Sequence, residues 1–341
     1  MIPGSRILIV NVNWLGDVLF STPAIRALRK HRPDAFLACL VPPRCRELLE
    51  RNPHLNEVIT LPDDTSFLRS AGGTLAAAFA LGRRRFDTAV FFHRSRTKMW
   101  AARAAGIRER LGFERPGGVA ALLTRTVPLP KAPLHRLDLF LALLGGLGVP
   151  SDGRRIEFVP GEGAAAELET LLASCGVRSD EPYAVVHPGG NWDLKRWPAG
   201  HFARWIRLFR ERFGWKVVLC GTAPERGVVE AIRAEAGEGA VSLCGRTSLG
   251  ALALLLKRAR FLLSNDSGPI HLAASQGARI LTLFGPTSPE LTGPVSEGRT
   301  LEIRKDVGCE VPCYFRSCDH RVCLDLVTPE EVLERTRELL A

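Results

Sequence analysis

The chain has 341 residues, of which 46% are apolar and 24% are charged, and this composition excludes a disordered or fibrous protein. No apolar run approaches the roughly 18–20 residues of a membrane span, and residues 1–14 lack the pattern of a cleavable signal. We therefore expect a cytoplasmic protein, and the length favours two domains of about 150–170 residues each.

The positive charge of the chain is concentrated in its N-terminal half. The formal net charge is +10, and residues 1–150 hold 22 Lys and Arg against 11 Asp and Glu, whereas residues 151–341 hold 24 against 25. This asymmetry indicates an anionic partner for the first half: a nucleic acid, an anionic membrane face or a phosphorylated substrate. General basicity without any partner is the alternative.

Apolar periodicity predicts strands that alternate with helices in two series. In the first series, the expected strands cover 6–12, 35–41, 57–61 and 87–93, and the expected helices cover 23–31, 44–51 and 97–105. In the second, a helix over 164–174 precedes strands at 183–187, 216–220, 240–243, 260–264 and 279–284, with helices at 202–213, 226–235, 249–258 and 270–276. This rhythm predicts an α/β fold of two doubly wound domains, residues 1–160 and 161–325, facing a cleft. A C-terminal helix is expected over 326–341, and one option is that it packs back on the N-terminal domain.

Three motifs fall where a strand ends and a helix begins. The first, NWLGDVLFSTPAIRAL, places Asp17 near a helix start, where a plain helix cap is the alternative. The second, HPGGNWDLKRWP, lets the main chain approach a ligand at its glycines and carries Lys195, which can reach a phosphate unless it is a solvated surface lysine.

The third motif is NDSGPIHLAASQG, residues 265–277. Its Asp266, Ser267 and Gly268 precede Pro269, which opens a helix whose free amides form an anion site. His271 lies one turn into that helix and is expected to face the same ligand, with core packing as the alternative. GPTSPE at 285–290 is either another side of the pocket or a turn. There is no GxGxxG after the first strand and no GxxxxGK[ST], which argues against nicotinamide chemistry and P-loop phosphoryl transfer.

The nine cysteines fall into two groups. Five are scattered through apolar stretches and are interpreted as reduced core residues: Cys39, Cys45, Cys175, Cys220 and Cys244. The other four cluster near the C-terminus around His320: Cys309, Cys313, Cys318 and Cys323. Their spacing lacks the C-x2-C pairs typical of zinc sites, which favours a reduced or oxidisable structural loop over a metal site. The sequence leaves metal binding and disulfide formation by these four open.

With these motifs the chain resembles the ADP-heptose:lipopolysaccharide heptosyltransferases of glycosyltransferase family 9 over nearly its whole length. The Cys-rich tail is most similar to the heptosyltransferase II branch. The resemblance implies a GT-B fold of two Rossmann-like domains, with the acceptor on the N-terminal domain and ADP-L-glycero-D-manno-heptose on the C-terminal domain. It implies Asp17 as general base and Lys195 as a phosphate contact. The other donor-binding residues that it implies are Gly190, Asn191, Glu225, Thr247, Asp266, Ser267, Gly268 and His271.

The expected reaction is an inverting transfer of heptose to a heptose of the lipopolysaccharide inner core, with no metal and no other cofactor. Lys195 and the helix amides after Asp266 would stabilise the departing ADP. The basic half suits a phosphorylated lipid A core acceptor at the anionic inner-membrane surface, which places the protein peripherally at the cytoplasmic face. Candidate acceptor contacts, just beyond the strand ending near residue 93, are Arg94, Arg96 and Lys98; a solvated basic helix start is the alternative.

Three other functions stay open from the sequence. One is a family 9 transferase with another sugar or acceptor, and the second is a GT-B epimerase acting on a nucleotide sugar. The third is a nucleic-acid-binding protein, which the absence of an aromatic-rich basic stripe or a recognition-helix pattern disfavours.

Overall fold

The computed structural model describes residues 2–62, 71–114, 120–178, 180–315 and 317–341. The chain divides into two compact units, Met1–Val159 and Pro160–Ala341, and each is described by itself. Each unit is built on one six-stranded sheet in which every pair of neighbouring strands is parallel. The predicted α/β class with two doubly wound sheets is therefore confirmed.

The sheet of the first unit has the order β3-β2-β1-β4-β5-β6. Its strands are β1 (Arg6–Val10), β2 (Phe36–Val41), β3 (Glu57–Thr60), β4 (Thr88–Phe91), β5 (Glu109–Phe113) and β6 (Arg125–Val127). Its helices are α1 (Leu15–Phe20), α2 (Thr22–His31), α3 (Arg46–Leu49), α5 (Ala71–Gly82), α6 (Arg96–Ala104) and α7 (Arg136–Gly146), with 3-10 turns at Pro43–Cys45 and Ala120–Leu122. The central strands are continuous apolar runs, as expected for parallel strands covered on both faces.

The sheet of the second unit has the order β12-β11-β10-β7-β8-β9. Its strands are β7 (Tyr183–His187), β8 (Lys216–Leu219), β9 (Ala240–Ser242), β10 (Leu262–Asn265), β11 (Ile280–Phe284) and β12 (Thr300–Arg304). Its helices are α8 (Ala164–Ser174), α9 (Ala199–Phe213), α10 (Arg226–Ala236), α11 (Leu249–Arg258), α12 (Gly268–Ser275), α13 (Pro289–Thr292), α14 (Val322–Asp325) and α15 (Pro329–Leu340), with 3-10 turns at Asp193–Lys195 and Ala223–Glu225.

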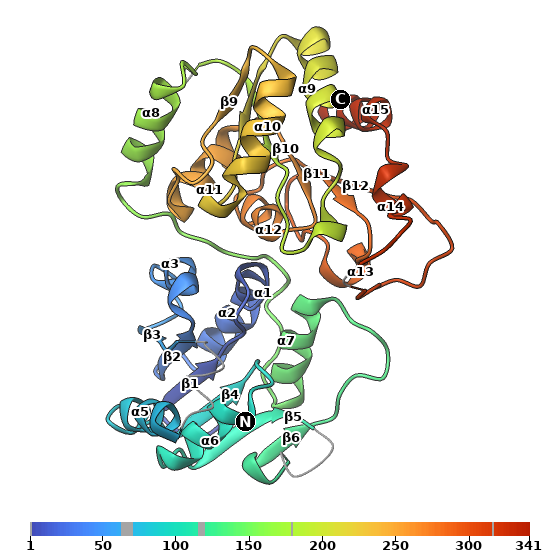
Figure 1. Cartoon of the computed structure of the whole chain (residues 1–341). Helices are drawn as coiled ribbons and strands as arrows, with labels where there is room; N and C mark the ends of the chain where they lie inside the picture. Colours follow the sequence, from blue (N-terminus) through green and yellow to red (C-terminus); the bar gives the residue numbers. More distant parts are fainter. Residues whose placement is uncertain (1, 63–70, 115–119, 179, 316) are drawn as a thin grey trace. The chain divides into compact units, whose positions relative to one another are not determined.

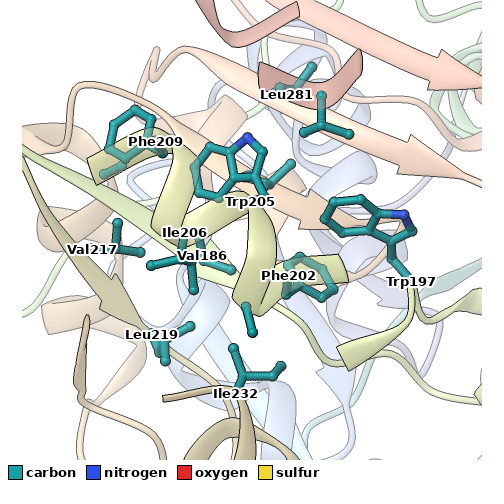
Figure 2. Packing of buried hydrophobic residues seen from close by; sticks show 14 of the residues in the cluster. Val186, Trp197, Phe202, Trp205, Ile206, Phe209, Val217, Leu219, Ile232 and Leu281 are labelled. Atoms are coloured by element: carbon teal, nitrogen blue, oxygen red, sulfur yellow. The ribbon is translucent and has the colours of Figure 1, made fainter. Parts of the chain in front are cut away.

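Aromatic side chains of α9 form the centre of the core in the second unit. Phe202, Trp205 and Phe209 are fully buried on one face of this helix, and Figure 2 shows them beside Trp197, which precedes the helix. The rings of Trp205 and Phe209 are stacked with their centroids 4.9 Å apart. The helix ends where Gly214 takes the left-handed conformation, with φ of 71°, which a glycine adopts without strain. Because Trp197 is buried in this core, the core holds the end of the segment that runs from Gly190 to α9.

The C-terminal helix α15 packs within the second unit. It contacts α9 and the strands β11 and β12. The reason is its apolar face, since Val332 and Leu339 are buried in the same core cluster as the aromatic residues of α9. Among the described residues, no helix combines the length and the apolar character needed to cross a membrane.

Both sheets reverse their strand order at a switch point. In the first, the chain leaves the central strand β1 for β2 on one side and later reaches β4 on the other; in the second, β7 has the same position between β8 and β10. Ligands of doubly wound sheets bind beyond the carboxyl ends of the strands at such a point. A ligand site is therefore expected at the segments that follow β1, β4, β7 and β10.

Candidate active site

One buried amide connects the loops at the switch point of the second unit. Asn265, the last residue of β10, accepts a hydrogen bond at Oδ1 from the backbone N–H of Trp197 at 3.0 Å. Its Nδ2 donates to the carbonyl oxygens of Pro188 at 2.8 Å and Gly189 at 3.0 Å. The loop after β7 and the segment before α9 are thus fixed to one strand end, which gives the site a defined shape before any ligand binds.

Lys195 and Asp266 form a buried ion pair at this edge of the sheet. Lys195 Nζ lies 2.6 Å from Asp266 Oδ2, and the two side chains are 11% and 5% exposed. Thr287 Oγ1 donates to the same carboxylate oxygen at 2.6 Å. Lys195 is therefore not a solvated surface lysine, and Asp266 holds its ammonium in place. An ammonium has three donor hydrogens, so this one can also bind a ligand phosphate.

The helix α12 starts beside this ion pair. Ser267 is its N-cap residue and Gly268 and Pro269 are its first two residues, but the hydroxyl of Ser267 does not cap the helix. Instead Ser267 Oγ lies 3.0 Å from His187 Nδ1 and donates to the carbonyl of Asn265 at 3.2 Å. The amides of a helix start form an anion site when no side chain caps them. His271 is buried in the first turn, and its contact with a ligand stays a prediction.

Glu225 connects the loops that follow β7 and β8. Its Oε1 accepts from the Gly190 N–H at 3.2 Å, and its Oε2 accepts from the N–H and the hydroxyl of Thr222, each at 2.7 Å. His187 Nε2 is 3.6 Å from Oε2. Burial by itself raises the pKa of Glu225, but His187 and the Thr222 donors outweigh burial and lower the pKa to about 2. A Cβ at Gly189 would lie 1.8 Å from Oε1, so any larger residue at this position would displace the Glu225 carboxylate.

Two other predicted donor contacts lie in loops of the same unit. Asn191 is exposed and follows Gly190, whose carbonyl accepts from Arg196 Nη2 at 2.8 Å. Thr247 is half-buried between β9 and α11, next to Ser248, which caps α11. The sugar contact expected of Gly190 and Asn191, and the nucleoside contacts expected of Glu225 and Thr247, stay predictions.

Asp17 lines a pocket within the first unit. It is the third residue of α1, and the N-cap position belongs to Trp14, so the interpretation of Asp17 as the helix cap is wrong. Its Oδ1 lies 3.8 Å from Arg136 Nε, and the two side chains are 24% and 47% exposed. The pocket has a volume of about 280 Å³ and is lined by Val12, Asn13, Trp14, Asp17, Phe92, His93, Arg94, Phe113, Arg136, Leu139, Phe140 and Leu143. A carboxylate beside guanidinium groups and aromatic rings suits a hydroxyl-rich anionic ligand.

The three predicted acceptor contacts have different environments. Arg94 lines the pocket, and Arg96 is exposed at the first position of α6 but is not one of the lining residues. Lys98 is buried, and its Nζ donates to Asn13 Oδ1 at 2.9 Å. A contact between Lys98 and an acceptor stays a prediction, but the alternative of a solvated lysine is wrong for this residue. The reason is local, because Ser95 caps α6 by accepting from the Lys98 N–H at 3.2 Å, and Lys98 then lies on the inward face.

Several site residues were not predicted from the sequence. They are Asn13, Trp14, His93 and Arg136 in the first unit and His187, Asn265 and Thr287 in the second. All except Arg136 follow a strand end or lie in a motif already noted, so their position could have identified them. Arg136 begins α7, for which the sequence analysis predicted no helix.

The cysteines behave as two groups in the structure as well. None of the nine, all of which lie in the described ranges, forms a disulfide, and of the five scattered ones only Cys175 is not fully buried. Burial raises the pKa of Cys39 to about 12, so this thiol is protonated and unreactive. The four clustered thiols line one cavity of about 260 Å³ together with His320. Within the described ranges, no three His, Cys, Asp or Glu side chains are grouped so as to hold a metal ion.

The chain matches known proteins over its full length. Residues 75–313 match the model of glycosyltransferase family 9 (heptosyltransferase). Lipopolysaccharide heptosyltransferase 2 of Escherichia coli K12 is 26% identical over 98% of both chains. The solved structure of E. coli ADP-heptose lps heptosyltransferase II, also 26% identical, covers 98% of each chain with a TM-score of 0.77. A family 9 glycosyl transferase from Veillonella parvula shares the fold with a TM-score of 0.87 at 23% identity, covering 100% of this chain and 98% of that one. The chain is therefore a member of glycosyltransferase family 9, an enzyme of the heptosyltransferase type.

Proposed function

We propose that this enzyme transfers L-glycero-D-manno-heptose from ADP-heptose to a heptose of the lipopolysaccharide inner core, with inversion at the anomeric carbon. The observation that carries the proposal is the buried pair of Lys195 and Asp266 beside the start of α12. A fixed ammonium next to free helix amides is suited to a diphosphate. The relatives named as heptosyltransferases 2, which match 98% of the chain, support this acceptor class.

The second unit is proposed as the donor-binding domain. Lys195 and the amides of Gly268 and its neighbours would bind the diphosphate, while Asp266 orients the ammonium. A solved E. coli heptosyltransferase named WaaC contains ADP and shares the fold, which supports an adenine nucleotide as ligand. We place the adenosine near Thr247 and Glu225 and the heptose near Gly190 and Asn191.

The first unit is proposed as the acceptor-binding domain. Its pocket joins Asp17 to Arg94 and Arg136, so a sugar hydroxyl can reach the carboxylate while phosphate or carboxylate groups of the acceptor pair with the guanidinium groups. Trp14 at the same pocket is 62% exposed, which leaves a flat apolar face for a sugar ring.

The proposed chemistry is a single displacement. Asp17 takes the proton of the acceptor hydroxyl as that oxygen forms a bond to the anomeric carbon. The bond from this carbon to the diphosphate oxygen breaks, and ADP leaves with the electron pair. Lys195 and the α12 amides stabilise the negative charge that develops on ADP. Such electrostatic stabilisation by fixed donors is usually the largest single contribution to the rate enhancement. Because these groups supply positive charge, we expect full turnover in the presence of a metal chelator.

Purified enzyme incubated with ADP-heptose and defined acceptors tests the proposal. We expect mass spectrometry to show one added heptose on a core that already carries a first heptose, and none on a core that lacks it. Addition to the heptose-free core would instead indicate a different acceptor within the family. Conversion of the ADP-sugar without any acceptor would indicate an epimerase, and no change of either substrate would contradict the proposal.

A further inference from the structure

The helix α5 has an unusual outward face. From Ala71 to Gly82 it contains no charged residue, and Arg83, Arg84 and Arg85 follow directly. Its inward side is buried in the core of the first unit through residues such as Leu81. On its outward side Leu75 and Phe79 are 66% and 69% exposed, and their spacing of four residues places them on one helix face. A helix that covers a sheet normally presents polar residues to water, so this apolar face requires an explanation.

The neighbouring helix α6 continues this face. The two helices pack against each other, as Figure 1 shows for the blue-green part of the chain. Met99 and Ala102 of α6 belong to the same core cluster as Leu81 of α5, so both helices cover the same face of the sheet. Their outward sides therefore point away from the sheet together. On α6 that side presents Trp100, which is 52% exposed.

The charge around this surface is mainly positive, although Glu57 of β3 pairs with Arg84 at 2.8 Å and Glu109 follows Arg108. Residues 71–108 hold eight Lys and Arg but only one acid, Asp87. Asp87 is engaged elsewhere, because its Oδ2 accepts from the backbone N–H groups of Ser5 and Arg6 at 2.8 and 2.9 Å. The exposed cations of this stretch are Arg83, Arg85, Arg94, Arg96, Arg103 and Arg108. The guanidinium of Arg83 lies 5.8 Å from the centre of the Phe79 ring, so apolar and cationic groups are interleaved.

We infer that the outward face of α5 and α6, formed by Leu75, Phe79 and Trp100 with the surrounding arginines, docks on an anionic lipid surface. Aromatic and aliphatic side chains enter the headgroup layer of a bilayer, while arginines pair with lipid phosphates. The excess of cations, eight against one acid within residues 71–108, is complementary to a negatively charged lipid surface.

The acceptor pocket includes a residue that lies just before α6, the helix that carries Trp100. Arg94 lines that pocket, Ser95 caps α6, and α6 then runs into Trp100. This inference rests on the proposed function in one respect: a lipid-linked acceptor held at the bilayer would lie next to the pocket. The docking itself needs no substrate and can be measured without one.

Flotation of the full-length enzyme with vesicles tests the inference. We expect binding to vesicles of phosphatidylcholine with phosphatidylglycerol, weaker binding to phosphatidylcholine alone, and loss of binding in high salt. The triple variant Leu75→Ser, Phe79→Ser, Trp100→Ser should bind at least about tenfold more weakly. The matched control is Tyr314→Ser, Phe315→Ser, Leu326→Ser, which removes three equally exposed apolar side chains from the second unit and should bind like the wild type.

A charge variant with Arg83→Gln, Arg85→Gln and Arg103→Gln should lose the preference for the anionic lipid. Equal binding to both vesicle types by the wild type, or unchanged binding by the apolar triple variant, would overturn the inference. So would a wild-type dimer that the apolar triple variant converts to a monomer in sedimentation, because a second copy would then cover this face.

A water-soluble, deacylated acceptor separates this inference from the proposed function. The apolar triple variant should transfer heptose to it at the wild-type rate but lose activity toward the same acceptor in anionic vesicles. Wild-type enzyme that transfers to neither acceptor but still floats with anionic vesicles would contradict the proposed function alone.

Discussion

The charged groups of the two candidate sites differ in how firmly the protein holds them. In the second unit, Lys195 and Asp266 are nearly enclosed and lie 2.6 Å apart, and buried hydrogen bonds of Asn265 fix the loops around them. In the first unit, Asp17 and Arg136 are 3.8 Å apart, their side chains are 24% and 47% exposed, and both line an open pocket. The proposed donor carries a diphosphate, so a rigid site suits it. A pocket with exposed arginines can instead adapt to the shape of the proposed acceptor.

Replacement of Asp17 by asparagine should have the largest effect. Loss of a general base typically lowers a rate by about 10²–10⁴-fold, so we expect kcat to fall by about 10³-fold. Calorimetry should show unchanged affinity for ADP, since Asp17 belongs to the first unit. Asp138→Asn, which removes another carboxylate of that unit from a surface pair with Arg154, is the control and should keep full activity. A variant at Asp17 that turns over like the wild type would rule out the base.

Removal of Lys195 tests whether the firmly held site serves the leaving group. We expect Lys195→Met to lower kcat/KM for the donor by about 10²-fold, because fixed donors to a developing charge are worth that much. It should also lower the free energy of unfolding by about 3–5 kcal/mol, since it leaves Asp266 buried without its cation. Adding Asp266→Leu should restore part of the stability but none of the activity.

The control for Lys195 is Lys216→Met, which breaks a partly exposed pair with Glu181 at 3.1 Å in the same unit. An exposed pair contributes about 0–1 kcal/mol, so both stability and donor kinetics should change little. Equal losses in the two variants would mean that the Lys195 pair has only a structural role.

Sequence patterns predicted the second unit more completely than the first. Continuous apolar strands and helices bounded by Pro and Gly were recognisable there, and the predicted helices over 164–174 and 249–258 match α8 and α11. In the first unit β5, β6, α5 and α7 were not predicted. β6 has three residues at a sheet edge, and α5 lacks the polar face by which an amphipathic helix is recognised. The unpredicted α7 is the helix that carries Arg136.

The partners of the predicted site residues could not be read from the sequence. Lys195 and Asp266 were both chosen as ligand contacts, but only the fold brings positions 71 residues apart into one ion pair. Lys98 likewise carries the charge of a surface residue, and the cap at Ser95 turns it inward. Charge and motif therefore identified the residues, while only the fold shows which groups of the protein each of them contacts.

Asn265→Ala tests whether the rigidity of the donor site matters for binding. The variant loses three hydrogen bonds and leaves the Trp197 N–H unpaired, so we expect about 2–3 kcal/mol less stability and a severalfold higher KM for the donor. Asn52→Ala is the control, because this buried asparagine of the first unit accepts from the His54 N–H at 2.9 Å. It should lose stability without a change in donor KM. A donor KM that stays at the wild-type value in Asn265→Ala would show that the loops do not need this support.

The smallest expected effect is the acid sensitivity that Glu225 gives to the donor site. Its pKa of about 2 lies below the ordinary value of 4.5, so its ionised form stabilises the fold fully above pH 4.5. That contribution is lost as the pH falls from 4.5 toward about 2. Glu225→Gln should therefore be less stable at neutral pH, and its urea midpoint should fall less than that of the wild type between about pH 5 and pH 3. Glu211→Gln, at an exposed position of α9, should follow the wild type. Parallel curves of urea midpoint against pH for Glu225→Gln and the wild type would mean that this carboxylate does not stabilise the loops of the proposed donor site. The contrast with the open pocket of the first unit would then depend on Lys195, Asp266 and Asn265 alone.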